Sequence, residues 1–205
     1  MGRWTKRSRV SHREGDMEPL TRESIMKMVE KGESLSGVNL SQADLSYSNL
    51  KKGNFSGADL RGAHLQNANL EGANLKGANL ENAFLFGSNL REANLEGAVL
   101  LGTNLQDTNL EGANLKETDL SNLSLFGAQL DGANLEGAVL TRAKLKRASL
   151  NGVNLKGADL SHAHMQRAVL KNADLTGANL QGANLTNADL TNAKVEGANF
   201  EGSSR

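Results

Sequence analysis

The chain of 205 residues contains no cysteine, and aromatic residues make up only 3% of it. Without cysteine there is neither a disulfide framework nor thiol chemistry. No segment approaches the run of about 20 apolar residues that a membrane-spanning helix needs. The basic N-terminus also lacks the apolar stretch of a secretory signal. These absences predict a cytoplasmic protein that does not engage a membrane.

A hydrophobic fraction of 38% is low for a globular protein, but the apolar residues follow a strict period. From Leu35 to Phe200, each residue number divisible by five carries a large apolar side chain. Of these 34 positions 30 are Leu, and the others are Phe55, Met165, Val195 and Phe200. A period of five matches neither a helix nor a flat strand. Strict short repeats predict a solenoid of stacked coils.

The repeat unit, as in Ala73-Asn74-Leu75-Lys76-Gly77, resembles the A(D/N)LXX unit of the pentapeptide-repeat family over residues 35–200. The resemblance implies an all-β solenoid, namely a right-handed quadrilateral parallel β-helix with four repeats in each coil. These 166 residues then form about eight coils, with the large residues and the small residues two places earlier pointing inward. We expect a slight bulge at Leu123 and Val153, where bulky residues occupy the small site.

Three segments flank or precede these repeats. Residues 1–16 are rich in Arg and Lys and predict a flexible basic arm, or else an expression leader ahead of a natural start at Met17. Residues 17–34 contain one short helix, predicted over 21–31, with Thr21 as its N-cap and Gly32 as its stop. This helix would cap the first coil, whose strand edges are otherwise unpaired. An interaction helix is the alternative.

Residues 201–205 are predicted to be a short C-terminal tail that cannot cover the last coil. Val195 and Phe200 would then lie at an open end of the inner column. Gyrase-binding relatives in the family dimerise through their C-terminal ends, so the resemblance implies a possible end-to-end homodimer. Val195 and Phe200 are therefore the candidate dimer end.

Residues 20 apart should stack on one another, so the outward positions form columns along the rod. Two sides carry columns of alternating charge, namely Lys76, Glu96, Lys116, Glu136, Lys156 and Lys51, Glu71, Arg91, Glu111. Opposite charges on neighbouring strands stabilise stacking by about 0.2–1 kcal/mol each. These two sides are predicted to be ordinary solvated surface.

The side centred on Leu45, Leu65 and Leu85 differs, because aromatic and basic residues gather at its outward positions. Such residues are enriched at protein interfaces, although singly exposed apolar residues are normal. Val99, Leu101 and Val139 on the preceding side could extend this surface. The candidate protein-binding face consists of Tyr47, His64, Phe84, Phe86, Phe126, Lys144, Lys146, Arg147, His164 and Arg167, with Arg142 and His162 at the adjoining corner.

Charge also varies along the predicted rod, although the whole chain has a formal net charge of zero. Residues 92–136 carry eight acids and one Lys, a net of −7. Residues 142–171 carry seven bases and one Asp, a net of +6. Such blocks can steer a charged partner or set the register of self-association.

Catalytic, metal and cofactor sites find little support in the sequence. His162 and His164 lack the additional ligands of a metal site, and a convex rod offers no pocket that excludes water. Gly72 and Gly77 open no helix, so they do not form a phosphate-binding loop. We therefore expect no enzyme, no cofactor and no small-molecule substrate.

Three function classes remain, and the sequence favours a structural or adaptor protein that presents a rigid face to an unknown protein. The quinolone-resistance branch of the family implies a second class, a DNA mimic that binds a type II topoisomerase such as DNA gyrase. That class is disfavoured, because the repeat region carries 14 bases against 16 acids and lacks the usual loop insertions of that branch. A nucleic-acid binder that uses the basic block is the third class.

Overall fold

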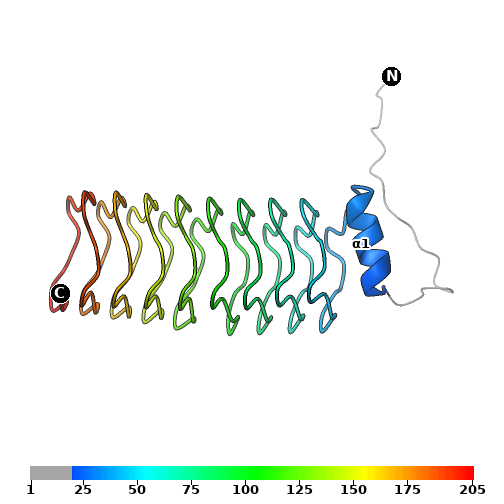
Figure 1. The fold of residues 1–205 in the computed structure, drawn as a ribbon, viewed down its shortest axis with the longest axis horizontal. Coiled ribbons are helices and arrows are strands. Elements are labelled where there is room, and N and C mark those ends of the chain that lie inside the picture. The colour runs from blue at the N-terminus through cyan, green and yellow to red at the C-terminus, as the bar shows by residue number, and fades with distance from the viewer. Residues whose placement is uncertain (1–19) are drawn as a thin grey trace, which may run out of the picture.

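The computed structural model describes residues 20–205 as a rod with a single helix, α1 (Arg22–Glu30), at its N-terminal end (Figure 1). Parallel bridges join residues that are 20 apart, from Asn39–Asp59 to Asn184–Ser204. Successive bridges start five residues apart, so each 20-residue coil has four sides. Within residues 20–205 these bridges involve single residues, and no longer strand forms. The arm predicted over residues 1–16 lies outside the described residues.

The backbone hydrogen bonds of one repeat explain why its residue types recur. The amides of Asn74, Leu75 and Gly77 donate to carbonyls of the two adjacent coils at 2.8–3.0 Å. The amide of Ala78 closes the corner by donating to the Leu75 carbonyl at 2.9 Å. The amide of Lys76 donates to Oδ1 of Asn74 at 3.2 Å, which is an Asx-type turn. All five amides are thus satisfied, which buried backbone requires.

The core is a column of large residues lined by small ones, as the sequence predicts. Every large inward residue from Leu35 to Leu185 is buried, and so are the small-site alanines between Ala58 and Ala183. Leu80 lies one coil before Leu100 on the same side, since the Leu80 amide donates to the carbonyl next to Leu100, that of Val99, at 2.8 Å. The predicted stacking of these two leucines is confirmed.

Each corner contains a residue with a left-handed backbone. Gly77 has φ 65°, and Asn82, one corner further along the chain, has φ 56°. Glycine and asparagine adopt this region at low cost. The corner side chains at several positions lie over a glycine of the next coil: a Cβ added to Gly182 would lie 2.5 Å from Nδ1 of His162. Glycine in such columns therefore makes room for the side chain one coil before it.

Helix α1 begins and ends where the sequence predicts, within one residue. Oγ1 of Thr21 accepts a hydrogen bond from the Ser24 amide at 3.1 Å, which caps the first turn. At the other end the amides of Gly32 and Glu33 donate to Val29 and Met28, which is a Schellman ending. Ile25 is buried against the core of the first coil, and Met26, Met28 and Val29 pack beside it.

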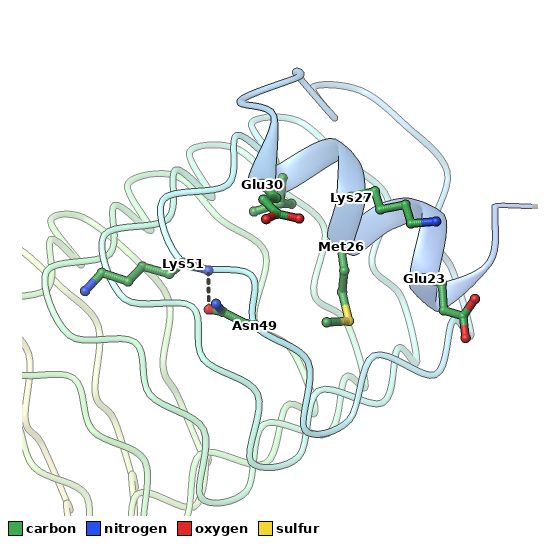
Figure 2. A pocket seen from close by; sticks show the side chains of 7 residues that line it. Glu23, Met26, Lys27, Glu30, Asn49 and Lys51 are labelled. Carbon is green, nitrogen blue, oxygen red and sulfur yellow. Dashed lines mark hydrogen bonds between the residues drawn. The ribbon is translucent and has the colours of Figure 1, made fainter.

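A side-chain bond also joins α1 to the first coil, where Nε of Arg22 donates to Oγ of Ser48 at 2.9 Å. Beside this contact an open groove of about 430 Å³ separates the helix from the coil (Figure 2). Met26 and Val29 line the groove together with the charged Glu23, Lys27, Glu30 and Lys51. Both its apolar residues belong to the contact between α1 and the core.

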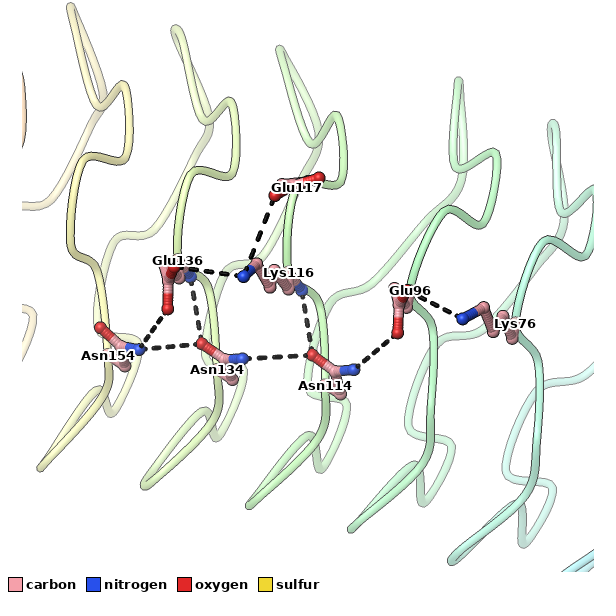
Figure 3. Close-up of polar contacts among 8 residues, drawn as sticks. All are labelled: Lys76, Glu96, Asn114, Lys116, Glu117, Asn134, Glu136 and Asn154. Atoms are coloured by element: carbon pink, nitrogen blue, oxygen red, sulfur yellow. Dashed lines mark hydrogen bonds and ion pairs between the residues drawn. The ribbon is translucent and has the colours of Figure 1, made fainter.

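The ladder of backbone bonds opens at one place, between residues 97–103 and 116–124. Val99 and Asp119 form no bridge, although the residues 20 before and 20 after them do. In Figure 3 the upper parts of the coils of Glu96 and Lys116 stand farther apart than those of other neighbouring coils, while their lower parts keep the usual spacing. At this opening the amides that lack their usual inter-coil bond are those of Gly97, Leu100, Gly102, Asp119 and Ser124.

Leu123 lies at this opening and explains it. It is buried in the column of small residues, where its neighbour one coil before is Thr103. The extra carbons of a leucine do not fit the narrow corner, so its coil stands away from the preceding one. The bulge expected at Leu123 is present, because the Ser124 amide lacks its bond to the preceding coil. The one expected at Val153 is not, because the Asn154 amide keeps its bond to the Ala133 carbonyl of the preceding coil at 3.0 Å. Valine is one carbon smaller and fits.

The C-terminal coil is less buried than those before it. Val195 is 42% exposed, and Phe200 is partly buried with the Arg205 guanidinium 4.6 Å above its ring. The amides of Leu190, Val195 and Phe200 have no backbone partner within the described residues. Residues 201–205, which the sequence assigns to a tail, continue the ladder, since Ser204 bridges to Asn184.

Candidate interaction face

The candidate residues lie on one side of the rod, which we name the Leu85 side. Its inward residues are Leu45, Leu65, Leu85, Leu105, Leu125, Leu145, Met165 and Leu185. On each coil the residues before and after the inward leucine point outward. The residue before the leucine forms the parallel bridges to the adjacent coils, and the residue after it begins the corner turn. Side chains on this side are therefore fixed at regular positions on a rigid backbone.

The aromatic residues nearest to one another are His64, Phe84 and Phe86. His64 and Phe84 are bridged neighbours, with ring centroids 4.9 Å apart and planes tilted by 32°. Phe86 lies two residues further along the same side. Phe84 and Phe86 remain 44% and 42% exposed. We call these three neighbouring side chains of the Leu85 side the aromatic patch.

Phe126 and Tyr47 lie apart from the aromatic patch. Phe126 is two coils from Phe86 in the same column, and the residue between them is Gln106, whose Nε2 donates to Oγ of Ser124 at 2.7 Å. Tyr47 occupies a corner two coils before Gly87, with φ 59°, and is 71% exposed. The ten predicted face residues are thus on one side and its corners but do not form one continuous apolar surface.

The basic residues of the face occupy two neighbouring coils. Lys144 is bridged to Ser124 on one side and to His164 on the other. The amide of Arg147 donates to the carbonyl of Gln166 at 3.1 Å, so Arg167 is the next residue in its corner column. Lys146 and the corner residues Arg142 and His162 complete the group, and all of these basic side chains are exposed.

On the other sides of the rod, charged side chains form ion pairs between neighbouring coils. Lys76 pairs with Glu96 at 2.9 Å and Lys116 with Glu136 at 3.2 Å (Figure 3). The hydrogen bond from Lys116 lowers the pKa of the Glu136 carboxyl below its ordinary value. Glu96 forms no ion pair with Lys116, just as Glu136 forms none with Lys156 one coil further, where the ladder is intact; each of these glutamates pairs with the lysine one coil before it. The predicted charge ladder is therefore present as separate pairs.

Asparagines add a second ladder beside these charges. Nδ2 of Asn134 donates to Oδ1 of Asn114 at 3.3 Å, and Nδ2 of Asn154 donates to Oδ1 of Asn134 at 3.0 Å (Figure 3). The same side chains accept from the backbone two residues later, as Asn134 does from the Glu136 amide. This double use confirms the structural role that the register of the asparagines predicts.

Neither a metal centre nor a membrane helix forms in the described part of the chain. Within residues 20–205 no three His, Cys, Asp or Glu side chains gather closely enough to hold a metal ion. Over the same residues the helix present is too short and too polar to span a membrane.

Sequence reasoning did not identify one contact of this surface. The stacking of His64 on Phe84 follows from their 20-residue separation, which could have been read from the sequence. Leu101, which the sequence predicts as a possible extension of the face, is 65% exposed beside the opening in the ladder. The opening itself depends on how far the coil yields to Leu123, which the sequence pattern does not give.

The comparisons with known proteins agree with this architecture. The model of the family "Pentapeptide repeats" matches the chain in eight copies, over residues 34–62, 54–91, 85–122, 124–161 and 163–202. These segments cover nearly the whole of the described rod. No curated protein gives a significant match.

Several solved structures are similar to the chain. HetL, a pentapeptide repeat protein involved in heterocyst differentiation regulation from the cyanobacterium Nostoc sp. strain PCC 7120, shares 29% identity over 89% of this chain and 93% of its own, with a TM-score of 0.46. Rfr23 from the cyanobacterium Cyanothece 51142 shares 32% identity over 49% of this chain and 63% of its own, with a TM-score of 0.39.

A trypsin-treated variant of QnrB1, a plasmid-mediated fluoroquinolone resistance protein, shares 21% identity over 82% of this chain and 77% of its own, with a TM-score of 0.54. This likeness concerns the fold alone. Together with the family match it assigns the four-sided rod to the right-handed quadrilateral β-helix.

Proposed function

Because this chain belongs to the pentapeptide-repeat family, we propose that it is a non-catalytic adaptor that binds a protein through the Leu85 side. The observation that carries the proposal is the aromatic patch of His64, Phe84 and Phe86, which stays exposed on a rigid backbone. Exposed aromatic residues held in fixed positions contribute most of the binding energy at many interfaces. A rigid scaffold also loses little conformational entropy on binding.

The proposal extends to the architecture that supports this side. Residues 35–200 form about eight coils, and α1 serves as a cap, supported by the burial of Ile25 and the bond from Arg22 to Ser48. A cap covers core leucines and unpaired strand edges that would otherwise favour aggregation. In this division residues 17–34 are the capping segment.

Replacing Phe84, Phe86 and Phe126 together by Ser is expected to remove a specific protein from those captured out of native lysate. The three side chains are exposed, so their loss weakens binding by deleting apolar contact area without disturbing the core. The measurement is quantitative mass spectrometry of proteins captured by wild type and variant, followed by direct binding of the protein that is lost.

The control replaces Leu20 by Ser, an exposed apolar residue outside the Leu85 side. This variant should capture the same proteins as wild type. Identical capture by wild type and the triple variant would contradict the proposed face.

Charge argues against the alternative of a DNA-mimicking partner for a type II topoisomerase. Such a mimic needs an acidic surface along much of the rod, whereas residues 142–171 carry a net charge of +6. Five exposed cations on the Leu85 side would repel a DNA-binding groove. If the captured partner were a topoisomerase whose supercoiling activity the chain inhibits, this alternative would replace the adaptor.

The exposed end of the last described coil supports a second interaction, an end-to-end homodimer through Val195 and Phe200. Its unpaired amides and partly exposed core residues would be covered by the same end of a second copy. The area is limited to one coil cross-section, so the affinity should be modest.

Phe200→Asp is expected to shift this dimer toward the monomer while the rod keeps its fold. A carboxylate placed between two apolar ends would have to be buried without a partner. Sedimentation across a range of concentrations measures the shift, with Thr191→Asp on the side of the same coil as the control. A wild-type chain that sediments as a monomer at high concentration would contradict the dimer.

A further inference from the structure

The cations of the Leu85 side differ from most other cations of the rod. On the other sides most lysines and arginines pair with a carboxylate of the same or an adjacent coil, as Lys51 does with Glu71 at 3.1 Å and Lys171 with Asp189 at 3.3 Å; among residues 35–200 the exception there is Lys52. Five cations of the Leu85 side and its corners have no carboxylate within 4.0 Å among residues 20–205. We call them the basic cluster: Arg142, Lys144, Lys146, Arg147 and Arg167.

The basic cluster also places like charges next to each other. Arg147 and Arg167 are successive residues of one corner column, whereas the other corner columns contain no two adjacent lysines or arginines. Like charges on neighbouring strands are destabilising. Their side chains also form no hydrogen bond within the described residues, and local rules are broken in this way mainly at functional sites.

We infer that the basic cluster is the docking site for an acidic segment of the protein that the Leu85 side binds. This inference rests on the proposed function and adds the chemistry of the partner. Carboxylates of the segment would lie against the arginine and lysine side chains. Arginine forms bidentate hydrogen bonds with carboxylates, which adds geometric specificity to the charge attraction.

An aromatic ring adjoins the basic cluster and defines a second requirement of the partner. Phe126 is the neighbour of Lys146 in its column, one coil before it, as the bond from the Gly127 amide to the Lys146 carbonyl shows. Its ring is 37% exposed. The docking segment should therefore carry an apolar side chain beside its carboxylates, in the direction of the N-terminal end of the rod.

The size and surroundings of the basic cluster favour an acidic peptide over a nucleic acid. The cluster is one side wide and two coils deep, which is about 10 Å along the rod. Nucleic acids bind through several phosphates spread along a strand. A strand that followed this corner toward the N-terminal end would meet Asp107 two coils before Arg147, and residues 92–136 carry a net charge of −7.

Charge reversal with a matched control tests the inference on the full chain. The test variant is Lys144→Glu/Lys146→Glu/Arg147→Glu, and the control is Lys156→Glu/Lys171→Glu/Lys194→Glu. Both change the net charge by the same amount at the same end of the rod, but the control residues lie on other sides. Circular dichroism and thermal melts verify that both variants keep the fold.

The probe is a fluorescein-labelled 12-residue peptide with six Glu beside two Leu, measured by fluorescence anisotropy. Its comparators are the same peptide with Gln in place of Glu and a 12-nucleotide oligothymidylate. We expect the acidic peptide to bind wild type, to lose at least tenfold in affinity for the test variant, and to change less than twofold for the control. The Gln peptide should bind at least tenfold more weakly than the acidic one, and binding should weaken with salt.

Three results would overturn the inference: tighter binding of the oligothymidylate than of the acidic peptide, equal losses in both variants, or no binding of the acidic peptide at low salt. The first result would mean that the basic cluster binds nucleic acid. The second would mean that the peptide responds to the net charge of the chain and not to the basic cluster. The partner captured in the aromatic-patch experiment separates this inference from the proposed function. If that partner still binds the test variant with unchanged affinity, the acidic docking site is wrong while the adaptor function stands.

Discussion

Replacing Leu105 by Ala is expected to lower the free energy of unfolding by about 2–5 kcal/mol. Leu105 is 1% exposed and lies near the middle of the inner column, with leucines one coil before and after it. The surrounding backbone is held by hydrogen bonds to both adjacent coils, so it cannot collapse fully around the cavity. Chemical denaturation followed by circular dichroism measures the change.

Leu101→Ala is the matched control for this experiment. Leu101 is the same residue type four positions earlier, but it is 65% exposed on the outside of the rod. The same substitution there should change the free energy of unfolding by less than about 0.5 kcal/mol. A Leu105→Ala variant as stable as Leu101→Ala would contradict the close-packed inner column.

The second large effect is expected from Ala113→Leu, which should destabilise the rod by about 1–3 kcal/mol through overpacking. Ala113 is fully buried at the small inward site, and the chain already shows what a leucine does there. At Leu123 the ladder between two coils is open. A second leucine two sides earlier in the chain should open the ladder at another corner.

Ala193→Leu provides the control for overpacking, because Ala193 occupies the same small site in the less buried last coil. A leucine there can point partly into solvent, so its effect should be small. Thermal melts of both variants measure the loss of stability. If Ala113→Leu melts like wild type, the inward assignment of the small site is wrong.

Much of the fold can be predicted from the sequence because each residue of a repeat has one physical task. Leu75 fills the core, Asn74 accepts the turn amide, and Gly77 takes the left-handed corner. With these tasks repeated in register, the 20-residue stacking of Leu80 and Leu100 follows. The short helix was also predictable, since Thr21 and Gly32 are strong end signals.

The details that sequence reasoning could not provide arise where the repeats are not equivalent. Leu123 and Val153 break the same rule, but only Leu123 opens the ladder, since the outcome depends on one carbon and on the residues stacked beside it. The pairing of Lys116 with Glu136 rather than with Glu96 also depends on where each long side chain reaches, which the repeat pattern does not give. Residues 201–205 join the ladder although they lack an inward leucine, because backbone bonds alone suffice to hold Ser204.

The sequence predicts which positions belong to the candidate site, but not whether their side chains form one continuous surface. A period of 20 places His64 beside Phe84 and Arg147 beside Arg167, and the structure shows both neighbours. What the sequence leaves open is the separation of the aromatic patch from the basic cluster. It also leaves open the absence of carboxylates around the cluster within residues 20–205, which depends on where each long side chain reaches.

The opening beside Leu123 has a consequence for how the rod unfolds. A solenoid behaves as a one-dimensional array whose cooperativity comes from the coupling between adjacent coils. At the opening one bridge and several inter-coil amide bonds are missing, so the coupling is weakened between two blocks of comparable length. The aromatic patch lies in the first block and the basic cluster in the second. A partner that spans both would therefore act as a clamp across the weakest junction and would make the two blocks unfold as one.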